Sequence, residues 1–225
     1  MNKHWIKYEI IEKIEFPQHP YFCAIASCCA VANALLKKKY TQADLHSLYG
    51  IGSKSKLNVP LKFDFSTKRL NGKNPVGKGI SNWDIIRLFN SIMLDNKSTP
   101  HSALLTGKNF AQIIINGNYR NIQDWLRKEN NQVIIHLHNH YVVYAGGYSN
   151  GSGLEYIICG DSSKGKGPIR SVDLAELIKL SNKKDKYNRY GFIFLSNKKI
   201  PLKKIFNISL PEMQPKESAN LERFG

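Results

Sequence analysis

The spacing of apolar residues divides the chain into a helix-rich first half and a strand-rich second half. The strongest helix pattern covers residues 23–36, an alanine-rich run without Gly or Pro that is apolar on nearly every side. We expect such a helix at the centre of a core rather than on a surface. Three lysines at 37–39 follow it, where cations complement the negative end of the helix dipole.

Two further helices are predicted by capping boxes, in which a hydroxyl side chain and an acidic side chain three residues later pair with free backbone N–H groups. The first box, at 41–44, precedes a short helix ended by Gly50. The second, at 81–84, opens a helix whose apolar face extends to Met93. Another short helix is predicted at 121–128.

The second half alternates strand-like runs with turn residues, and strands are predicted at 132–138, 140–148, 154–159 and 189–195, with a helix near 173–180. The Gly- and Ser-rich run 149–153 suits a hairpin turn between the second and third of these strands. The β-prone run 112–115 is expected to return to the core, and the element type of residues 1–16 stays open. Helices first and strands later predict an α+β fold.

Length and composition fit one packed domain. The 225 residues are 42% hydrophobic, ample for a core, and we assign residues 1–198 to a single domain. Residues 199–225 become basic and then polar, which is typical of an extension or tail.

The net charge of +16 comes mostly from lysines scattered through loops and helix ends, so it predicts a solvated basic surface. An acidic protein partner is compatible with this charge. Nucleic acid is not expected, because no basic stripe with interleaved aromatic residues occurs. There is no apolar run long enough to cross a bilayer and no secretory signal. Four cysteines without regular spacing indicate a reducing compartment, hence a cytoplasmic protein.

The first candidate for chemistry is Cys23, at the start of the apolar helix. The positive end of a helix dipole lowers the pKa of a thiol and favours the thiolate, so this position suits a nucleophile. Gln18 lies in the proline-bounded approach to it. A buried core thiol is the common alternative, and we accept it for Cys28 and Cys29, which lie within the helix.

Two residues downstream complete a pattern. His140 opens one predicted strand and Asp161 follows the next one. If the two strands pair across 149–153, the end of the second returns to the start of the first, which brings Asp161 near His140. The order Cys, His, Asp is that of papain-like cysteine enzymes.

These residues also carry a family resemblance, over roughly 18–195. Residues 18–35 resemble the nucleophile segment of phytochelatin synthases, with a Gln, an aromatic-Cys pair, an Ala-Ser pair and an Asn-Ala-Leu ending. The His140-Tyr-Val-Val run and the later Asp are similar to the papain-like peptidase domains that remove bacteriocin leader peptides. Ala24 replaces the glycine usual after the nucleophile, and Gln18 lies one residue closer to the cysteine than in phytochelatin synthases.

The resemblance implies a papain-like fold, with an N-terminal helical half around the nucleophile helix and a C-terminal antiparallel sheet. It also implies a bacterial protein, for which export as an effector without a signal peptide is the alternative to the cytoplasm. Cys23 would attack an amide carbonyl, His140 would protonate the departing amine, and Asp161 would orient the imidazole. Gln18 and the Cys23 N–H would stabilise the oxyanion. No cofactor or metal is needed.

Three functions are compatible with this arrangement. The first expectation is a cysteine peptidase or amidase that works through an acyl-enzyme on a peptide. The alternative is a glutathione hydrolase or γ-glutamylcysteine transferase, as in phytochelatin synthases and their relatives. A third is a non-catalytic basic binding module that keeps the triad as a relic.

Two competing motifs are weaker. Residues 72–79 match the phosphate-loop spacing up to its lysine, but Gly79 stands where a Ser or Thr would bind magnesium. The histidines at 136, 138 and 140 would form a zinc site with Cys159 or Asp161 if they shared one strand. Asn139 is a turn residue, however, which would separate the first and last histidines onto different strands. A metal site is therefore not our expectation.

Overall fold

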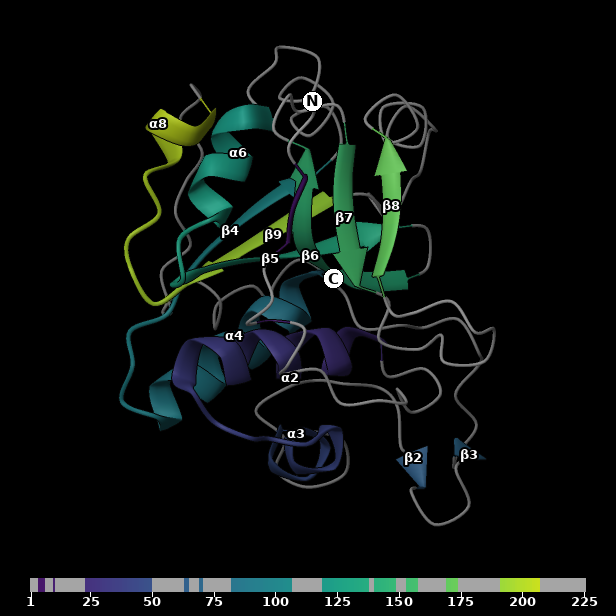
Figure 1. Cartoon of the computed structure of the whole chain (residues 1–225). Helices are drawn as coiled ribbons and strands as arrows, with labels where there is room; N and C mark the ends of the chain where they lie inside the picture. Colours follow the sequence, from purple (N-terminus) through teal and green to yellow (C-terminus); the bar gives the residue numbers. More distant parts are fainter. Residues whose placement is uncertain are drawn as a thin grey trace.

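An antiparallel sheet forms the centre of the molecule (Figure 1). The computed structural model describes residues 4–6, 10, 23–49, 63–64, 69–70, 82–106, 119–137, 140–148, 153–157, 169–173 and 191–206. Within them, the strands in sheet order are β4 (His101–Thr106), β9 (Gly191–Ser196), β5 (Asn131–Leu137), β6 (His140–Tyr148), β7 (Gly153–Ile157) and β8 (Ile169–Asp173). A seventh strand, β1 (His4–Ile6), also pairs with β6, and a separate hairpin joins β2 (Phe63–Asp64) to β3 (Arg69–Leu70).

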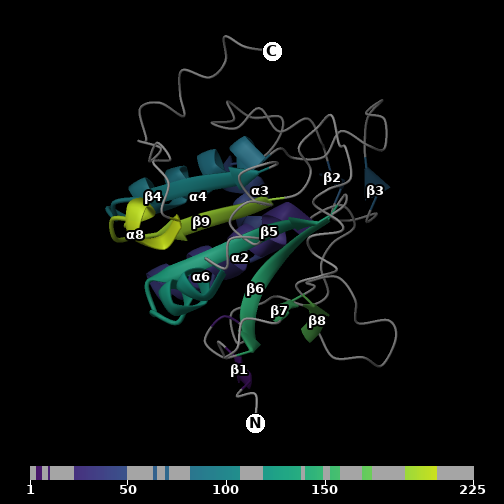
Figure 2. The same cartoon turned by 90° about the horizontal axis from the view of Figure 1, so that it is seen from above.

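Helices cover both faces of the sheet. On one side lie α2 (Cys23–Leu36) and α4 (Asn82–Asp95), with α3 (Gln42–Tyr49) against α2; on the other lie α6 (Tyr119–Leu126) and α8 (Leu202–Phe206) (Figures 1 and 2). Successive side chains of a strand point to opposite faces. In β9, Ile193 and Leu195 accordingly join the core under α2 and α4, whereas Phe192 and Phe194 join the core under α6. The α+β class is thus confirmed, and burial on both faces explains why β9 is apolar throughout.

The predicted strands 132–138, 140–148, 154–159 and 189–195 are confirmed as β5, β6, β7 and β9, with small differences at their ends. The hairpin across 149–153 is confirmed too, since Gly147 pairs with Leu154 and Val143 with Ile157. Five elements were not predicted: β2, β3, β4, β8 and α8. The predicted helix near 173–180 and the run 112–115 lie outside the described residues.

The N-terminal segment, whose type was open, contributes a strand where it is described. β1 lies so close to β6 that a side chain at Gly146 would collide with the backbone of Trp5. Glycine is therefore required there for close backbone approach.

The central helix predicted at 23–36 is confirmed as α2, and nearly all of its residues are buried. Its C-terminal end is closed by the buried Asn33 side chain, which accepts from the Tyr40 N–H and donates to the Tyr40 carbonyl, both at 2.8 Å. The capping box at 41–44 is also confirmed: the Thr41 N–H donates to Asp44 at 2.8 Å, and the Asp44 N–H donates to Thr41 Oγ1 at 3.0 Å. The bond from the Thr41 N–H, together with the Thr41 side chain, lowers the pKa of the Asp44 carboxyl.

Helix α4 begins at Asn82, as its apolar pattern predicts, and Ser81 of the second predicted capping box lies outside the described residues. Beyond the boundary expected at residue 198, α8 places Leu202 and Ile205 in the core beside α6. The packed part of the chain therefore continues through α8.

Candidate functional site

The N-terminal end of α2 meets the start of β6, and Cys23 lies at this junction. Cys23 is the first residue of α2, a half-buried free thiol. The backbone N–H groups of Tyr141, Ala24 and Cys23 itself lie close enough to its sulfur to favour the thiolate. Two of these donors belong to the first turn of the helix, and the third belongs to the strand. Segments distant in the sequence thus meet near one sulfur atom.

The acidity of this thiol differs from the sequence expectation. Burial raises the pKa of Cys23, and the three backbone N–H groups act against burial without outweighing it. The expected lowering by the helix terminus is therefore wrong in its net direction. The donors of the helix end are present, but removing a thiolate from water disfavours it more than they favour it. Cys28, in the middle of the helix, is fully buried, and burial raises its pKa further.

His140 is the first residue of β6 and directly precedes Tyr141. It is half-buried, and burial lowers the pKa of its imidazole because the charged form loses hydration. Burial is the cause of this shift, and Cys23 contributes nothing to it. At neutral pH, these changes favour the uncharged form of the thiol and the uncharged form of the imidazole.

Tyr141 connects the strand to the second helix of this layer. Its phenol donates to Asn82 Oδ1 at 2.9 Å, and Asn82 is the first residue of α4. Its ring stacks on His136 of β5, with 4.1 Å between ring centroids and 17° between planes. The N-terminal ends of α2 and α4 therefore both reach this one residue. Sequence analysis missed Asn82 and Tyr141, because each has the composition of an ordinary helix start or strand residue.

The other two predicted site residues, Asp161 and Gln18, lie outside the described residues. β7 is described as far as Ile157, which pairs with Val143. Its pairing with β6 runs from Gly147 toward the His140 end of that strand.

His136 and His140 lie on adjacent strands, as the turn character of Asn139 predicts, with Leu137 paired to His140. Among the described residues, no group of three or more His, Cys, Asp and Glu side chains is placed to hold a metal ion. The remaining members of the zinc hypothesis (His138, Cys159 and Asp161) and the glycine-rich loop 72–79 are outside the described residues.

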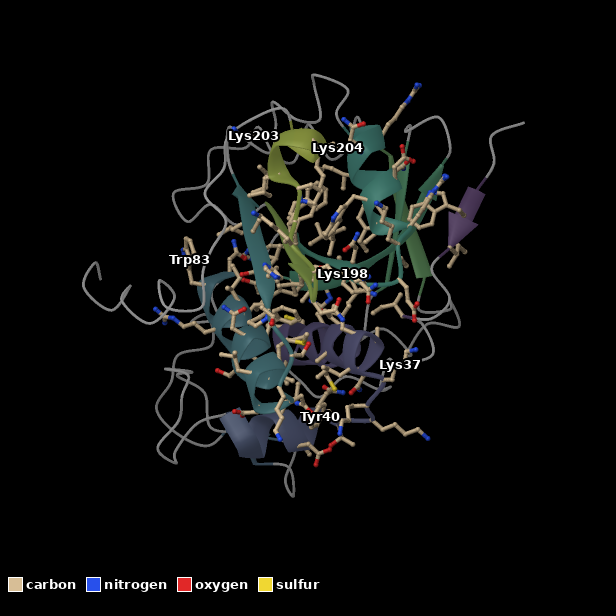
Figure 3. The ribbon with its side chains drawn as sticks, turned by 90° about the vertical axis from the view of Figure 1, so that its left-hand side faces the viewer. Lys37, Tyr40, Trp83, Lys198, Lys203 and Lys204 are labelled. Carbon is tan, nitrogen blue, oxygen red and sulfur yellow. The ribbon has the colours of Figure 1, made fainter. Side chains whose placement is uncertain are left out.

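Basic residues are exposed on the far side of the sheet. Figure 3 shows Lys203 and Lys204 on α8, remote from α2, with Lys198 in the segment before it. Lys37, after α2, pairs with Glu129 at 3.6 Å, but both side chains are largely exposed, so this pair stabilises the fold little. None of the described helices has the length and apolar character needed to cross a lipid bilayer.

Comparison with known proteins does not extend this description. The sequence matches no protein-family model, and no curated protein matches it.

Proposed function

We propose that this protein is a papain-like cysteine peptidase or amidase with Cys23 as its nucleophile and His140 as its base. The observation that supports it is the packing of α2 against β6, which places the Tyr141 N–H near the Cys23 sulfur. That packing brings a cysteine at a helix N-terminus beside the residue that follows His140. Nucleophile and base at such a junction is the arrangement that covalent catalysis on an amide requires.

The acid–base chemistry follows from the two pKa directions. Since the thiol and the imidazole are both uncharged at rest, His140 takes the Cys23 proton as the sulfur attacks the amide carbonyl. The resulting imidazolium then gives that proton to the departing amine, leaving an acyl-enzyme. Water, activated by the neutral imidazole, releases the acid and restores the thiol.

The two remaining roles rest on sequence. Asp161 accepts a hydrogen bond from the second nitrogen of His140 and so fixes its tautomer. The course of β7 supports this role, since β7 runs toward the His140 end of β6 and Asp161 follows four residues after Ile157. The Gln18 amide and the Cys23 N–H stabilise the oxyanion of the tetrahedral intermediate.

A peptide is the substrate that we favour over glutathione. Trp83, next to the Asn82 that holds Tyr141, is 38% exposed and is one of two large apolar side chains exposed in the described part of the chain. In Figure 3, Trp83 lies at the N-terminal end of α4 and projects outward. An exposed indole offers contact area to an apolar side chain of a peptide, and glutathione has no such side chain.

The proposal is tested by mass-spectrometric analysis of products from a peptide library and from glutathione, each incubated with wild type and Cys23→Ala. We expect peptide cleavage by wild type, and a loss of at least about 1,000-fold in turnover for Cys23→Ala. Cys28→Ala is the matched control, because it also removes a thiol from α2 but one that is buried within the helix.

Turnover by Cys23→Ala close to that of wild type would reject Cys23 as the nucleophile. Products from glutathione alone would establish the alternative, a glutathione hydrolase or γ-glutamylcysteine transferase. No product from either substrate, with Cys23 no more reactive than an ordinary buried thiol, would favour the non-catalytic binding module.

A further inference from the structure

Tyr141 lies near the starts of both α2 and α4. We infer that Tyr141 is a positioning residue for Cys23: the bond between its phenol and Asn82 holds the Tyr141 N–H against the Cys23 sulfur. This inference rests on the proposed function for its catalytic meaning. Its structural part, the control of Cys23 by the Asn82–Tyr141 bond, is measurable on the thiol alone.

The Tyr141 side chain is held on two sides. The phenol is almost completely buried and ends on Asn82, and the ring face lies against His136. A ring stacked on its cross-strand neighbour has little freedom to rotate, so the position of its hydroxyl group is fixed. The Asn82 carboxamide therefore fixes where the first residues of β6 lie relative to α4.

That placement matters for Cys23 because a backbone donor cannot adjust independently of its strand. Of the three N–H groups at the sulfur, those of Cys23 and Ala24 belong to α2 and move with it. The Tyr141 N–H is the one that comes from another element. It favours the developing thiolate only while β6 stays in register with the start of α2, and the Asn82 bond secures that register.

The chain offers a matched pair of residues at the other end of the same helices. Tyr40, after α2, accepts a hydrogen bond from Asn96 Nδ2 at 2.8 Å, and Asn96 follows α4. A tyrosine–asparagine bond thus lies at each end of α4: one joins it to β6 and the other to the segment after α2, and Figure 3 shows Tyr40 at the end of α4 opposite to Trp83. Loss of either bond should lower stability by a similar amount, but one bond alone adjoins Cys23.

The experiment compares Tyr141→Phe with Tyr40→Phe in the full chain. Cys23 alkylation by iodoacetamide is followed site-specifically by mass spectrometry, at a pH well above the ordinary histidine pKa of about 6.5. We expect a rate about three- to tenfold lower in Tyr141→Phe, the effect of weakening one hydrogen bond to the thiolate. Tyr40→Phe should alkylate Cys23 at the wild-type rate while losing a similar amount of stability to urea.

With a cleavable peptide in hand, Tyr141→Phe should lower kcat while leaving KM within about twofold, because the donor acts on the reacting sulfur. Asn82→Ala should reproduce the alkylation change, and the double variant should add little to either single variant, since both remove one bond.

Equal alkylation rates in Tyr141→Phe and wild type would overturn the inference, as would an equal change in Tyr40→Phe. Peptide turnover in wild type together with unchanged Tyr141→Phe kinetics would refute the inference and leave the proposed function standing. The reverse result, slower alkylation in Tyr141→Phe without turnover in wild type, would retain the control of Cys23 and refute the peptidase.

Discussion

At the scale of single residues, Cys23 and His140 are not a thiolate and an imidazolium in the resting protein. Burial raises the pKa of the thiol and lowers the pKa of the imidazole, so a proton resides on sulfur at neutral pH. In the mechanism that we propose, the proton therefore crosses from Cys23 to His140 during attack rather than before it. This order of events makes kcat/KM depend on the pKa of His140 in the free enzyme.

We therefore expect kcat/KM to reach half its maximum below about pH 6.5, the value of an unperturbed histidine, because burial keeps His140 uncharged at lower pH. Cys23 alkylation should keep rising above about pH 8.5, because burial raises the pKa of this thiol. The alkylation rate and the steady-state cleavage rate, each followed from pH 4 to pH 10, measure these two pH dependences.

A constant alkylation rate between about pH 5 and pH 8 would contradict this expectation, since it is the signature of a thiolate already formed.

The buried imidazole has a consequence for stability as well. The pKa of His140 is lower in the folded than in the unfolded chain, so stability is full above the ordinary histidine pKa. It is lost progressively as the pH falls from there through the lower pKa of the folded state.

At the scale of elements, α2 and α4 end in the same way. Each helix is followed by a lysine in the left-handed region, Lys37 with φ 53° and Lys97 with φ 55°. In each case, the next N–H returns to a carbonyl of the last turn: Lys38 to Asn33, and Ser98 to Met93. This is the Schellman geometry, in which glycine is usual because a side chain strains the positive φ.

Replacing Lys97 by glycine should consequently stabilise the fold, by about 0.5–1 kcal/mol, because relief of the strained φ exceeds the added freedom of the unfolded chain. Urea unfolding followed by circular dichroism measures the change. Lys39→Gly is the control: Lys39 is also an exposed lysine after a helix, but it is not among the residues with positive φ. Equal effects of the two substitutions would refute the role of the φ angle.

Local signals predicted the elements that depend on local interactions. The box at 41–44 and the alanine-rich run of α2 contain their own stabilising groups, so they could be read without knowledge of the fold. β4 and β8 were missed because polar residues interrupt their apolar pattern, whereas their stability comes from pairing with β9 and β7. α8 was missed because its two lysines dominate its composition, whereas its burial comes from contact with α6.

The same distinction applies to the candidate site. Cys23 and His140 could be proposed from their positions at the starts of a helix and a strand. The direction of each pKa could not, because burial depends on what the rest of the chain places around them. The Asn82–Tyr141 bond was equally inaccessible, since it joins residues whose proximity is created by the sheet.

At the scale of the whole molecule, the core continues past the composition change near residue 198. Ile200, Leu202 and Ile205 are buried against α6 and its face of the sheet. Together they remove three large apolar side chains from water, each worth about 1.5–3 kcal/mol. Their sum is comparable to the whole stability of a typical domain.

Deletion of residues 199–225 is therefore expected to unfold the protein or leave it aggregated, whereas deletion of 207–225 should retain a cooperative unfolding transition. Thermal unfolding of the two purified truncations, with the full chain beside them, distinguishes these outcomes. Cooperative melting of the protein that lacks residues 199–225, at the melting temperature of the full chain, would show that α8 is dispensable for the core.

The place of β9 has a consequence for synthesis on the ribosome. This late strand pairs with β4 on one side and with β5 on the other, and both are synthesised much earlier. The edge of each strand that pairs with β9 therefore stays unpaired by it while the intervening residues are synthesised. Until β9 is synthesised, Leu104 and Ile134 lack Ile193, the residue that pairs with both of them. The core between α2 and the sheet is then incomplete. In a nascent chain with Cys23 already outside the ribosome, the thiol would thus belong to an unfinished fold until β9 has been made.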